Sequence, residues 1–239
     1  MQRVDELEIL DSDACSPADV ETSMQDLGRV NRWFGGVGTT QKMVERVALA
    51  SGMKRLSLLE VAAGSGEVPK MVQRRLALQR ITLDLTLLDR ARSHLPSGNH
   101  TGENHTPKSP GVVADALALP FGDGAFDMVS CNLFAHHLNP QQLAQFVREG
   151  LRASRHAVLI NDLVRHPLHL ALVYASYPIM RSRVAWLDGL ASVRRAYVPD
   201  EIRNMLASAL SPAAAAQLEI SRNYLFRMAV IVWKGARSA

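Results

Sequence analysis

Hydrophobic positions along the chain switch repeatedly between helical and strand-like spacing, and this alternation predicts an α/β fold. Near the N-terminus, apolar residues recur at helical spacing over residues 17–33, and Ser16 is a suitable cap for that helix. A second helix is expected over Thr39–Ala50. Further helices are predicted over Lys70–Leu78, Pro140–Ser154 and Pro199–Ala209. The two N-terminal helices are typical either of a lid over a ligand site or of simple packing against the core.

Short apolar runs between these helices predict the strands of a buried sheet. We expect strands over Leu56–Val61, Ile81–Leu88, Val112–Ala116, Phe126–Asn132, His156–Asn161 and Tyr224–Lys234. Strands that alternate with helices usually form a parallel sheet, whereas the alternating run at the C-terminal end suits a last, antiparallel strand. The fold class is therefore predicted to be α/β, with a mostly parallel sheet.

The first strand leads directly into a glycine-rich turn and a helix start. Gly64 and Gly66 allow the backbone to turn sharply and to come close to a ligand, and Pro69 suits the first turn of the next helix. A dinucleotide-binding turn would require a third glycine where this chain has Glu67, and a carboxylate there would repel a pyrophosphate. The turn therefore predicts a ligand without a phosphate at this position.

Glu60, Ala62, Gly64 and Gly66 form an acidic-x-small-x-Gly-x-Gly pattern. This pattern resembles motif I of the class I S-adenosylmethionine (SAM) methyltransferases, although alanine replaces the usual first glycine. SAM carries an ammonium, a sulfonium and a ribose, so a nearby acid is favourable. The resemblance implies a Rossmann-like sheet with SAM as the cofactor, and it implies that these four residues bind it.

Acidic residues follow the glycine turn in the order that this resemblance implies. Asp89 ends the second predicted strand, where it is placed to accept both ribose hydroxyls; capping of the next helix is the competing role. Asp115 lies at an interval suited to the exocyclic amine of adenine. The tract from Asp115 through "LPFGDGAFDMV", which includes Asp127, to Asn132 is similar to the middle motifs of SAM methyltransferases that act on small molecules. The expected cofactor residues also include Arg90 and Ala116.

Histidines after the fourth and fifth strands are the candidate catalytic groups. His136 and His137 follow the fourth strand, where acceptor and methyl donor meet in this architecture, and His166 follows the fifth. A histidine can act as a general base near neutral pH. A structural, hydrogen-bonding role for the pair is the alternative.

Residues 163–197 are predicted to form a helical cap over the acceptor. Apolar and aromatic residues recur in this segment, which suggests a hydrophobic substrate, although core packing or a dimer contact would produce the same pattern. The candidate substrate-binding residues are Arg165, Tyr174, Tyr177, Arg194 and Arg195. The domain organisation expected is a tail with lid helices over residues 1–52, followed by a SAM-binding domain over residues 53–239.

Composition adds few constraints. The 239 residues are 47% hydrophobic and 21% charged, with a net charge of +4 and a pI of about 9.3. Arginines are scattered and aromatics make up only 5%, so no nucleic-acid partner is expected. Cys15 and Cys131 give neither a disulfide framework nor a zinc spacing, which fits a reducing cytoplasm without a resident metal. The N-terminus is too polar for a signal peptide, and no apolar run is long enough to span a bilayer.

The insertion over Ser93–Gly111 is rich in Ser, Gly, Asn, His and Pro and is expected to be mobile. Its histidines, His94, His100 and His105, are expected to be solvated rather than metal-binding.

The expected activity is methyl transfer to an oxygen or carbon of a small, apolar acceptor of aromatic or polyketide type. The tracts "GRVNRWFGG" and "NDLVRHPLHLALVY" look like those of stand-alone bacterial quinone and polyketide tailoring methyltransferases. Methyltransferases of nucleobase amines carry Asn/Asp-Pro-Pro-aromatic where residues 132–135 read Asn-Leu-Phe-Ala. A macromolecular substrate, or a non-catalytic SAM-binding or interaction protein, remains as the alternative, and the oligomeric state is left open.

Overall fold

A seven-stranded sheet forms the centre of the computed structural model, which describes residues 1–11, 15–95, 109–210 and 217–235. The strands lie in the order β3-β2-β1-β4-β5-β7-β6. Their bounds are β1 Arg55–Val61, β2 Thr82–Asp89, β3 Gly111–Val113, β4 Phe126–Asn132, β5 Ser154–Leu163, β6 Gln217–Asn223 and β7 Arg227–Trp233. All pairs up to β4–β5 are parallel, and β7 runs antiparallel to β5. The α/β Rossmann-like prediction, with a reversed last strand, is confirmed.

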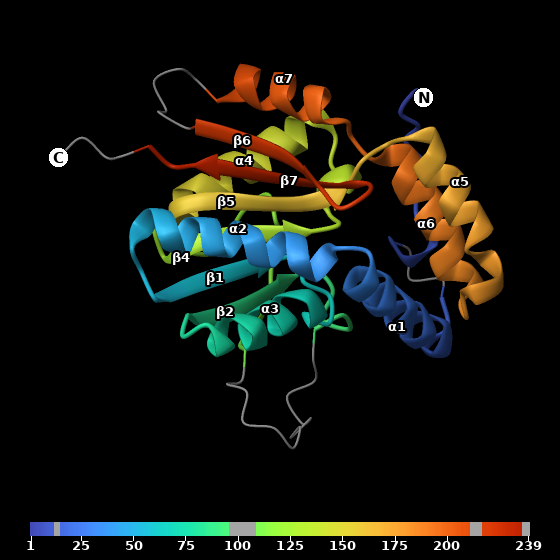
Figure 1. Cartoon of the computed structure of the whole chain (residues 1–239), viewed down its shortest axis with the longest axis horizontal. Coiled ribbons are helices and arrows are strands. Elements are labelled where there is room, and N and C mark those ends of the chain that lie inside the picture. The colour runs from blue at the N-terminus through green and yellow to red at the C-terminus, as the bar shows by residue number, and fades with distance from the viewer. Residues whose placement is uncertain (12–14, 96–108, 211–216, 236–239) are drawn as a thin grey trace.

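Helices cover both faces of this sheet (Figure 1). Their bounds are α1 Pro17–Trp33, α2 Gly36–Ser51, α3 Glu67–Leu78, α4 Pro140–Ala153, α5 Pro167–Ala175, α6 Arg183–Arg195 and α7 Pro199–Ala209, with short 3-10 turns η1 Ile9–Asp11, η2 Ala135–His137 and η3 Tyr177–Ile179. Alternation along β1 divides the core: Leu58 belongs to the cluster that includes α2 and α3, whereas Leu59 belongs to the cluster that includes α4 and α7. Both faces of the central strands are buried, which explains their nearly continuous apolar sequence.

Prediction from the sequence missed one strand and misplaced the ends of several strands and helices. Gln217–Asn223 forms the edge strand β6, in which only Leu218 and Ile220 are apolar, so its pattern is weak. The predicted strand from Tyr224 begins instead at Arg227, because residues 224–226 form the turn of the β6–β7 hairpin. The third strand ends at Val113 rather than Ala116. The second N-terminal helix starts at Gly36, and the helix expected from Lys70 starts at Glu67.

The predicted cap consists of α5, η3 and α6, which lie together beyond one edge of the sheet (Figure 1).

Most of the predicted insertion over Ser93–Gly111, including His100 and His105, lies outside the described residues. Cys15 and Cys131 are both free thiols. No helix within the described ranges is long and apolar enough to cross a membrane. The proposed division at residue 52 stays a prediction.

Candidate active site

The carboxyl ends of four neighbouring parallel strands bring most of the candidate residues to one edge of the sheet. In the order of the sheet, β2 ends at Asp89, β1 leads into the glycine turn, β4 ends at Asn132 and β5 ends just beyond Asp162. Asn132 is aligned with Asn161 in the β4–β5 register. Ligands of open α/β sheets bind outside these carboxyl ends, so this edge is the candidate site.

The glycine turn and Asp89 are joined by hydrogen bonds. The N–H of Gly64 donates to one carboxylate oxygen of Asp89 at 2.9 Å, and the N–H of Ala91 donates to the other at 3.0 Å. His94 lies 3.4 Å from the same carboxylate. Burial, the largest influence, raises the pKa of Asp89, but these donors together hold that pKa below its usual value. Asp89 is therefore a carboxylate that also braces the turn.

The two glycines of the turn have different reasons for lacking a side chain. Both adopt positive φ, +52° at Gly64 and +69° at Gly66. A Cβ on Gly66 would lie 2.6 Å from Leu87 of β2, so this glycine is required by packing. A Cβ on Gly64 would meet no atom of the described residues within 4 Å. The space beside Gly64 is therefore open to a ligand.

Glu60 is buried at the end of β1 and belongs to a polar network. Its carboxylate accepts from the Ser130 hydroxyl and, at 2.6 Å, from the Asn132 side-chain amide. Burial raises the pKa of Glu60 to about 7, against the opposing effect of these two donors. The Asn132 amide oxygen in turn accepts from the Thr40 hydroxyl of α2 at 2.6 Å. The network thus ties two predicted cofactor residues to the helix that covers them.

Two residues at this edge adopt a strained backbone. Ala62 has φ +52° and Leu133 has φ +53°, and they follow the adjacent strands β1 and β4. Left-handed backbone costs a residue with a Cβ about 1–2 kcal/mol. Such strain gathers at functional sites, where the surrounding structure over-determines the backbone. Ala62 occupies the position of the missing glycine in the turn, so the substitution noted in the sequence carries a conformational cost.

His136 is held between two carboxylates. Its Nδ1 lies 2.7 Å from Asp162 Oδ1, and its Nε2 lies 3.2 Å from Glu8 Oε1, while its side chain is only 2% exposed. Burial is the largest influence and lowers the pKa of His136, but Asp162 and Glu8 together raise it to about 9. His136 is therefore an imidazolium at neutral pH and does not accept a further proton.

His137 lies beside His136 and faces two charged groups. Its Nε2 is 3.6 Å from Glu8 Oε1, and its Nδ1 is 3.4 Å from a guanidinium nitrogen of Arg195 in α6. The Arg195 guanidinium also donates to the His137 carbonyl at 3.2 Å. Arg195 is buried and thereby connects the cap to the histidine pair. The structure thus brings Arg195, a substrate-binding candidate, next to His136 and His137, which are catalytic candidates.

The remaining cofactor candidates flank the same edge. Ala114 donates its N–H to the Asp89 carbonyl, so the segment after β3 lies against the end of β2. Within this segment Asp115 is exposed and accepts from the Leu117 N–H at 2.8 Å, and Ala116 is buried in the core. Arg90 is exposed. Asp127 instead lies at the start of β4, where its carboxylate accepts from the N–H and hydroxyl of Ser57 and pairs with Arg155.

His166 and Arg165 both have structural partners. His166 caps α5, with Nδ1 accepting from the Leu168 N–H at 3.1 Å, and its ring stacks on Phe226. Arg165 is buried, where it pairs with Glu201 of α7 and donates to the Ala196 carbonyl at 2.7 Å. Both residues therefore help to attach the cap to the sheet domain.

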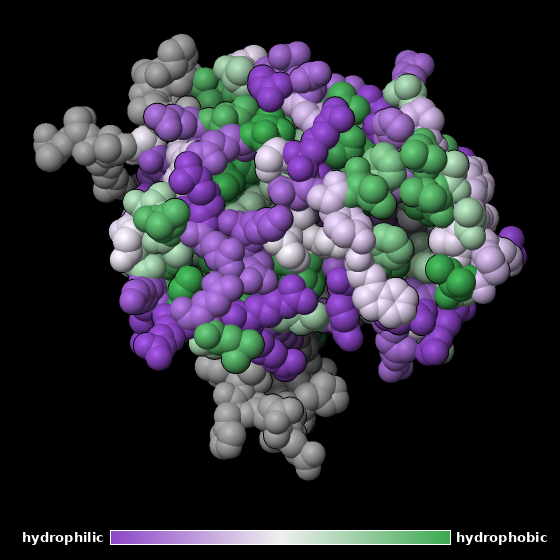
Figure 2. Space-filling model, in the orientation of Figure 1, coloured by the Kyte–Doolittle hydropathy of each residue, from purple (hydrophilic) through white to green (hydrophobic). Residues whose placement is uncertain are grey.

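The other cap candidates lie toward solvent. Tyr174 and Tyr177 pack edge-on against Trp186 of α6, and the Tyr174 hydroxyl accepts from Arg194 at 2.7 Å. Figure 2 shows hydrophobic side chains gathered where α5 lies. In α5 and η3, the large exposed side chains are Leu168, Leu172, Tyr174, Tyr177 and Ile179.

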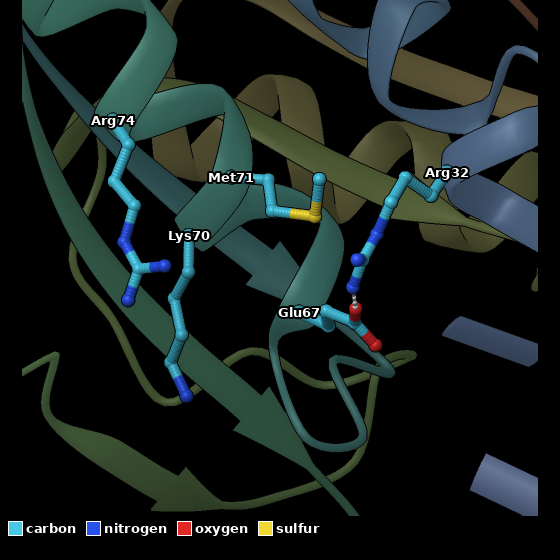
Figure 3. Close-up of a pocket in the computed structure, with 5 residues that line it drawn as sticks. All are labelled: Arg32, Glu67, Lys70, Met71 and Arg74. Carbon is cyan, nitrogen blue, oxygen red and sulfur yellow. Dashed lines mark hydrogen bonds and ion pairs between the residues drawn. The ribbon is translucent and has the colours of Figure 1, made fainter. Parts of the chain in front are cut away.

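Helix α1 closes over the start of α3. Figure 3 shows Arg32 of α1 reaching the Glu67 carboxylate, to which it donates at 2.8 Å beside a hollow of about 260 Å³. A Cβ on Gly28 would overlap that carboxylate, so the two helices pack closely here. Lys70 donates to the Ser65 carbonyl of the turn at 2.7 Å. The first N-terminal helix therefore packs against the start of α3, next to the glycine turn, and its role as a lid stays a prediction.

Sequence reasoning missed the acidic partners of His136. Asp162 was visible at the end of a predicted strand, but its distance along the chain from His136 hid the contact. Glu8 lies in an irregular, polar segment with no periodicity, and its contact with His136 spans 128 residues. The strand order could have suggested Asp162, because β4 and β5 are adjacent.

Comparison with known proteins is consistent with this site. Residues 58–156 match the family model described as a methyltransferase domain. The chain is 26% identical over 200 residues to the demethylmenaquinone methyltransferase of Renibacterium salmoninarum, a match that covers 82% of this chain and 75% of the relative.

Solved methyltransferases share the fold. The plantazolicin methyltransferase BpumL, in complex with a monoazolic desmethylPZN analog and SAH, superimposes with a TM-score of 0.68 at 13% identity over 92% of this chain and 91% of that one. A SAM-dependent methyltransferase from Aquifex aeolicus gives a TM-score of 0.55 at 10% identity, over 90% of this chain and 98% of that one. Together the matches support a class I SAM-dependent methyltransferase with SAM as its cofactor.

Proposed function

We propose that this methyltransferase transfers the methyl group of SAM to an oxygen or carbon of a small, largely apolar acceptor. The observation that carries the proposal is that one edge of the sheet holds the glycine turn with Asp89 on one side and the histidine pair with Arg195 on the other. The cap over this edge carries exposed apolar side chains, which suit an organic acceptor.

The cofactor side of the site fits SAM. Gly64 leaves open space beside the turn, and the Asp89 oxygen that accepts from the Gly64 N–H retains a lone pair for a ribose hydroxyl. The residues proposed to hold the cofactor are Glu60, Ala62, Gly64, Gly66, Asp89, Arg90, Asp115, Ala116 and Asn132. When bound, SAM supplies an electrophilic methyl group on a sulfonium. The chain then has mainly to align the acceptor with that group and to exclude water.

The acceptor side supplies the proton chemistry. An acceptor oxygen or carbon forms a bond to the methyl carbon as the sulfur–methyl bond breaks, and its own proton must leave. His136 already carries its proton, and His166 caps α5 and stacks on Phe226. We therefore assign the proton-accepting role to His137, which is 20% exposed beside Arg195. Arg165, Tyr174, Tyr177 and Arg194 are proposed to shape the acceptor side through the cap.

The similar proteins support the class of acceptor. Demethylmenaquinone, named for the Renibacterium salmoninarum relative, is a quinone, and the plantazolicin enzyme was crystallised with an azole analog. Both names refer to compounds far smaller than a nucleic acid or a folded protein. The proposed substrate is accordingly a small ring compound with an acidic O–H or C–H.

The test measures cofactor binding and methyl transfer separately. SAH affinity would be determined by calorimetry for the wild type, Asp89→Asn and the control Asp84→Asn. Asp84 lies on the same strand but pairs with Arg55 on the exposed surface. Loss of a hydrogen bond to a charged group costs about 1.5–3 kcal/mol, so Asp89→Asn should weaken binding at least tenfold and Asp84→Asn less than twofold.

Methyl transfer would then be followed by mass spectrometry with a panel of hydroxyquinones, phenols and 1,3-diketones. Transfer to at least one of these, reduced more than tenfold in His137→Gln, supports the proposal. Tight SAH binding without transfer to any of them would favour a non-catalytic SAM-binding protein or a macromolecular substrate.

A further inference from the structure

The N-terminal segment, residues 1–11, forms a strap that is bound along α6. At its start, Arg3 donates to the Arg195 carbonyl at 2.7 Å. At its end, the N–H groups of Ile9 and Leu10 donate to the Asp188 carboxylate at 2.7 and 2.9 Å. Figure 1 shows the N-terminus beside α5 and α6. The strap therefore lies across the acceptor side of the site and is fixed at two places.

Each acidic residue in the middle of the strap faces a cationic group. Asp5 lies 3.5 Å from Arg195, and Glu6 lies 3.0 Å from Arg194. Glu8 faces His136 and His137 together. The strap thus supplies negative charge to a surface that the cap and η2 make positive.

Glu8 differs from the other two because it is inserted into the site. Its side chain is 11% exposed, against 70% for Asp5 and 46% for Glu6. Besides the histidines, its Oε1 accepts from the Ser192 hydroxyl at 2.7 Å. Burial alone raises the pKa of Glu8, yet His136, His137 and Ser192 hold it below its usual value. A buried carboxylate is therefore stabilised at the position where an acceptor would meet the histidine pair.

The charges around this position need an anion. Asp162 lies on the side of the His136 ring that faces away from Glu8, and it accepts from both Nδ1 and the backbone N–H of His136. On the near side, Nε2 of His136 has the Glu8 carboxylate as its buried counter-ion, and Nε2 of His137 lies 3.6 Å from the same oxygen. The Arg195 guanidinium lies next to this position, against His137 and 3.5 Å from Asp5. A buried cation without a counter-ion is costly. Departure of Glu8 therefore requires that another anion take its place.

We propose that the cluster of His136, His137 and Arg195 binds an anionic oxygen of the acceptor, and that Glu8 occupies this position until the acceptor displaces the strap. The inference rests on the proposed function and specifies its acceptor as a carboxylate, phenolate or enolate. It also assigns Glu8 a role in specificity, since a neutral ligand would not replace its charge.

The same atoms could be considered for a metal ion. One ligand atom from each of Glu8, His136 and His137 lies within 4.8 Å of the others. However, a divalent cation would have to displace the proton of His136 and tolerate the Arg195 guanidinium, which lies 3.4 Å from His137. An anion meets neither obstacle, so the charges favour the anion, and metal binding becomes an outcome of the test.

The experiment uses salicylate and its neutral counterpart salicylamide as probes of equal size. Their affinities would be measured by calorimetry at pH 7 with saturating SAH, for the wild type, Glu8→Gln and Glu6→Gln. Glu8→Gln keeps the shape of the strap but removes its charge, so salicylate should bind at least tenfold more tightly than to the wild type. Salicylamide should change less than twofold, and Glu6→Gln should leave both affinities unchanged.

A second measurement needs no variant. Cleavage by Glu-C protease after Glu8 reports displacement of the strap in the full wild-type chain. With SAH present, salicylate should accelerate this cleavage at least threefold, and salicylamide should not. Equal effects of the two probes in both experiments would overturn the inference.

Two further outcomes are decisive. Micromolar Zn²⁺ binding to the wild type that is lost in Glu8→Gln would replace the anion site with a metal centre. Retained SAH binding without any preference for the anion refutes this inference alone, whereas absence of SAH binding refutes the proposed function.

Discussion

The Nδ1 atom of His136 lies 2.7 Å from one oxygen of Asp162, and the backbone N–H of His136 donates to the other oxygen at 2.9 Å. A single carboxylate thus fixes both the ring and the main chain of this residue. Burial, the largest influence, raises the pKa of Asp162. His136 and the backbone donors together lower that pKa by more, so the carboxylate stays ionised. The pair links η2 to β5 and determines which ring nitrogen of His136 faces Glu8.

This pair predicts that stability falls as the solution becomes alkaline. The folded pKa of His136, about 9, exceeds its ordinary value of 6.5, so its contribution is complete below pH 6.5 and is lost as pH rises through 9. The loss should be on the order of 2–3 kcal/mol. Urea unfolding at pH 6.5 and 9.0 would measure it.

His136→Asn keeps a donor toward Asp162 but cannot titrate, so it should lack most of this loss. His156→Asn, on the same strand as Asp162, serves as the control and should retain it. Two groups near the pair act outside this window: the lowered pKa of Glu8 matters at acidic pH, and the raised pKa of the Cys131 thiol matters above pH 9. If the free energy of unfolding changes equally between pH 6.5 and 9.0 in the wild type and in His136→Asn, His136 is neutral in the folded protein.

Substitution of Gly64 separates backbone strain from loss of ligand space. Gly64 and Gly52 both have positive φ, and a Cβ on either would meet no described atom within 4 Å. Alanine at either position should cost about 1–2 kcal/mol of folding free energy. Gly52 ends α2, so Gly52→Ala should bind SAH like the wild type. Gly64→Ala should bind at least tenfold more weakly in calorimetry, and equal affinities would mean that the cofactor does not approach this turn.

Replacement of Ala62 by glycine should relieve strain. The left-handed backbone of Ala62 costs about 1–2 kcal/mol, which glycine would relieve. The extra flexibility of glycine in the unfolded chain destabilises the folded state by about 0.5–1 kcal/mol and offsets part of this relief. Ala62→Gly should therefore leave stability unchanged or raise it by up to about 1.5 kcal/mol. The neighbouring Ala63→Gly has no such strain to release and should destabilise by about 0.5–1 kcal/mol. Urea unfolding of both variants gives the comparison, and a destabilised Ala62→Gly would contradict it.

Local patterns were enough to predict that the glycine turn and Asp89 lie at the same edge of the sheet. The strand Leu56–Val61, the glycine turn and Asp89 follow one another within a short stretch of chain, and each has a signal of period or composition. Parallel strands that alternate with helices end at the same edge, so Gly64, Asp89, Asp115 and Asn132 were expected together before any contact was known.

Edge elements and strained positions were less predictable. The edge strand β6 has only one buried neighbour and hence few apolar residues, which leaves a weak pattern. The left-handed backbone of Ala62 and Leu133 has no signal in the sequence, because glycine is the residue that normally indicates it.

By itself, the sequence determined the order of the core strands and helices, the glycine turn and the acids that accompany it, because these depend on neighbours along the chain. Only the tertiary structure decided that Glu8, His136 and Asp162 form one charged series, and that Arg195 of the cap joins it. Glu8 and His136 are 128 residues apart, and no periodicity encodes such a pairing. Their contact results from the packing of the strap on α6 and of β4 against β5, where burial strengthens each charge interaction.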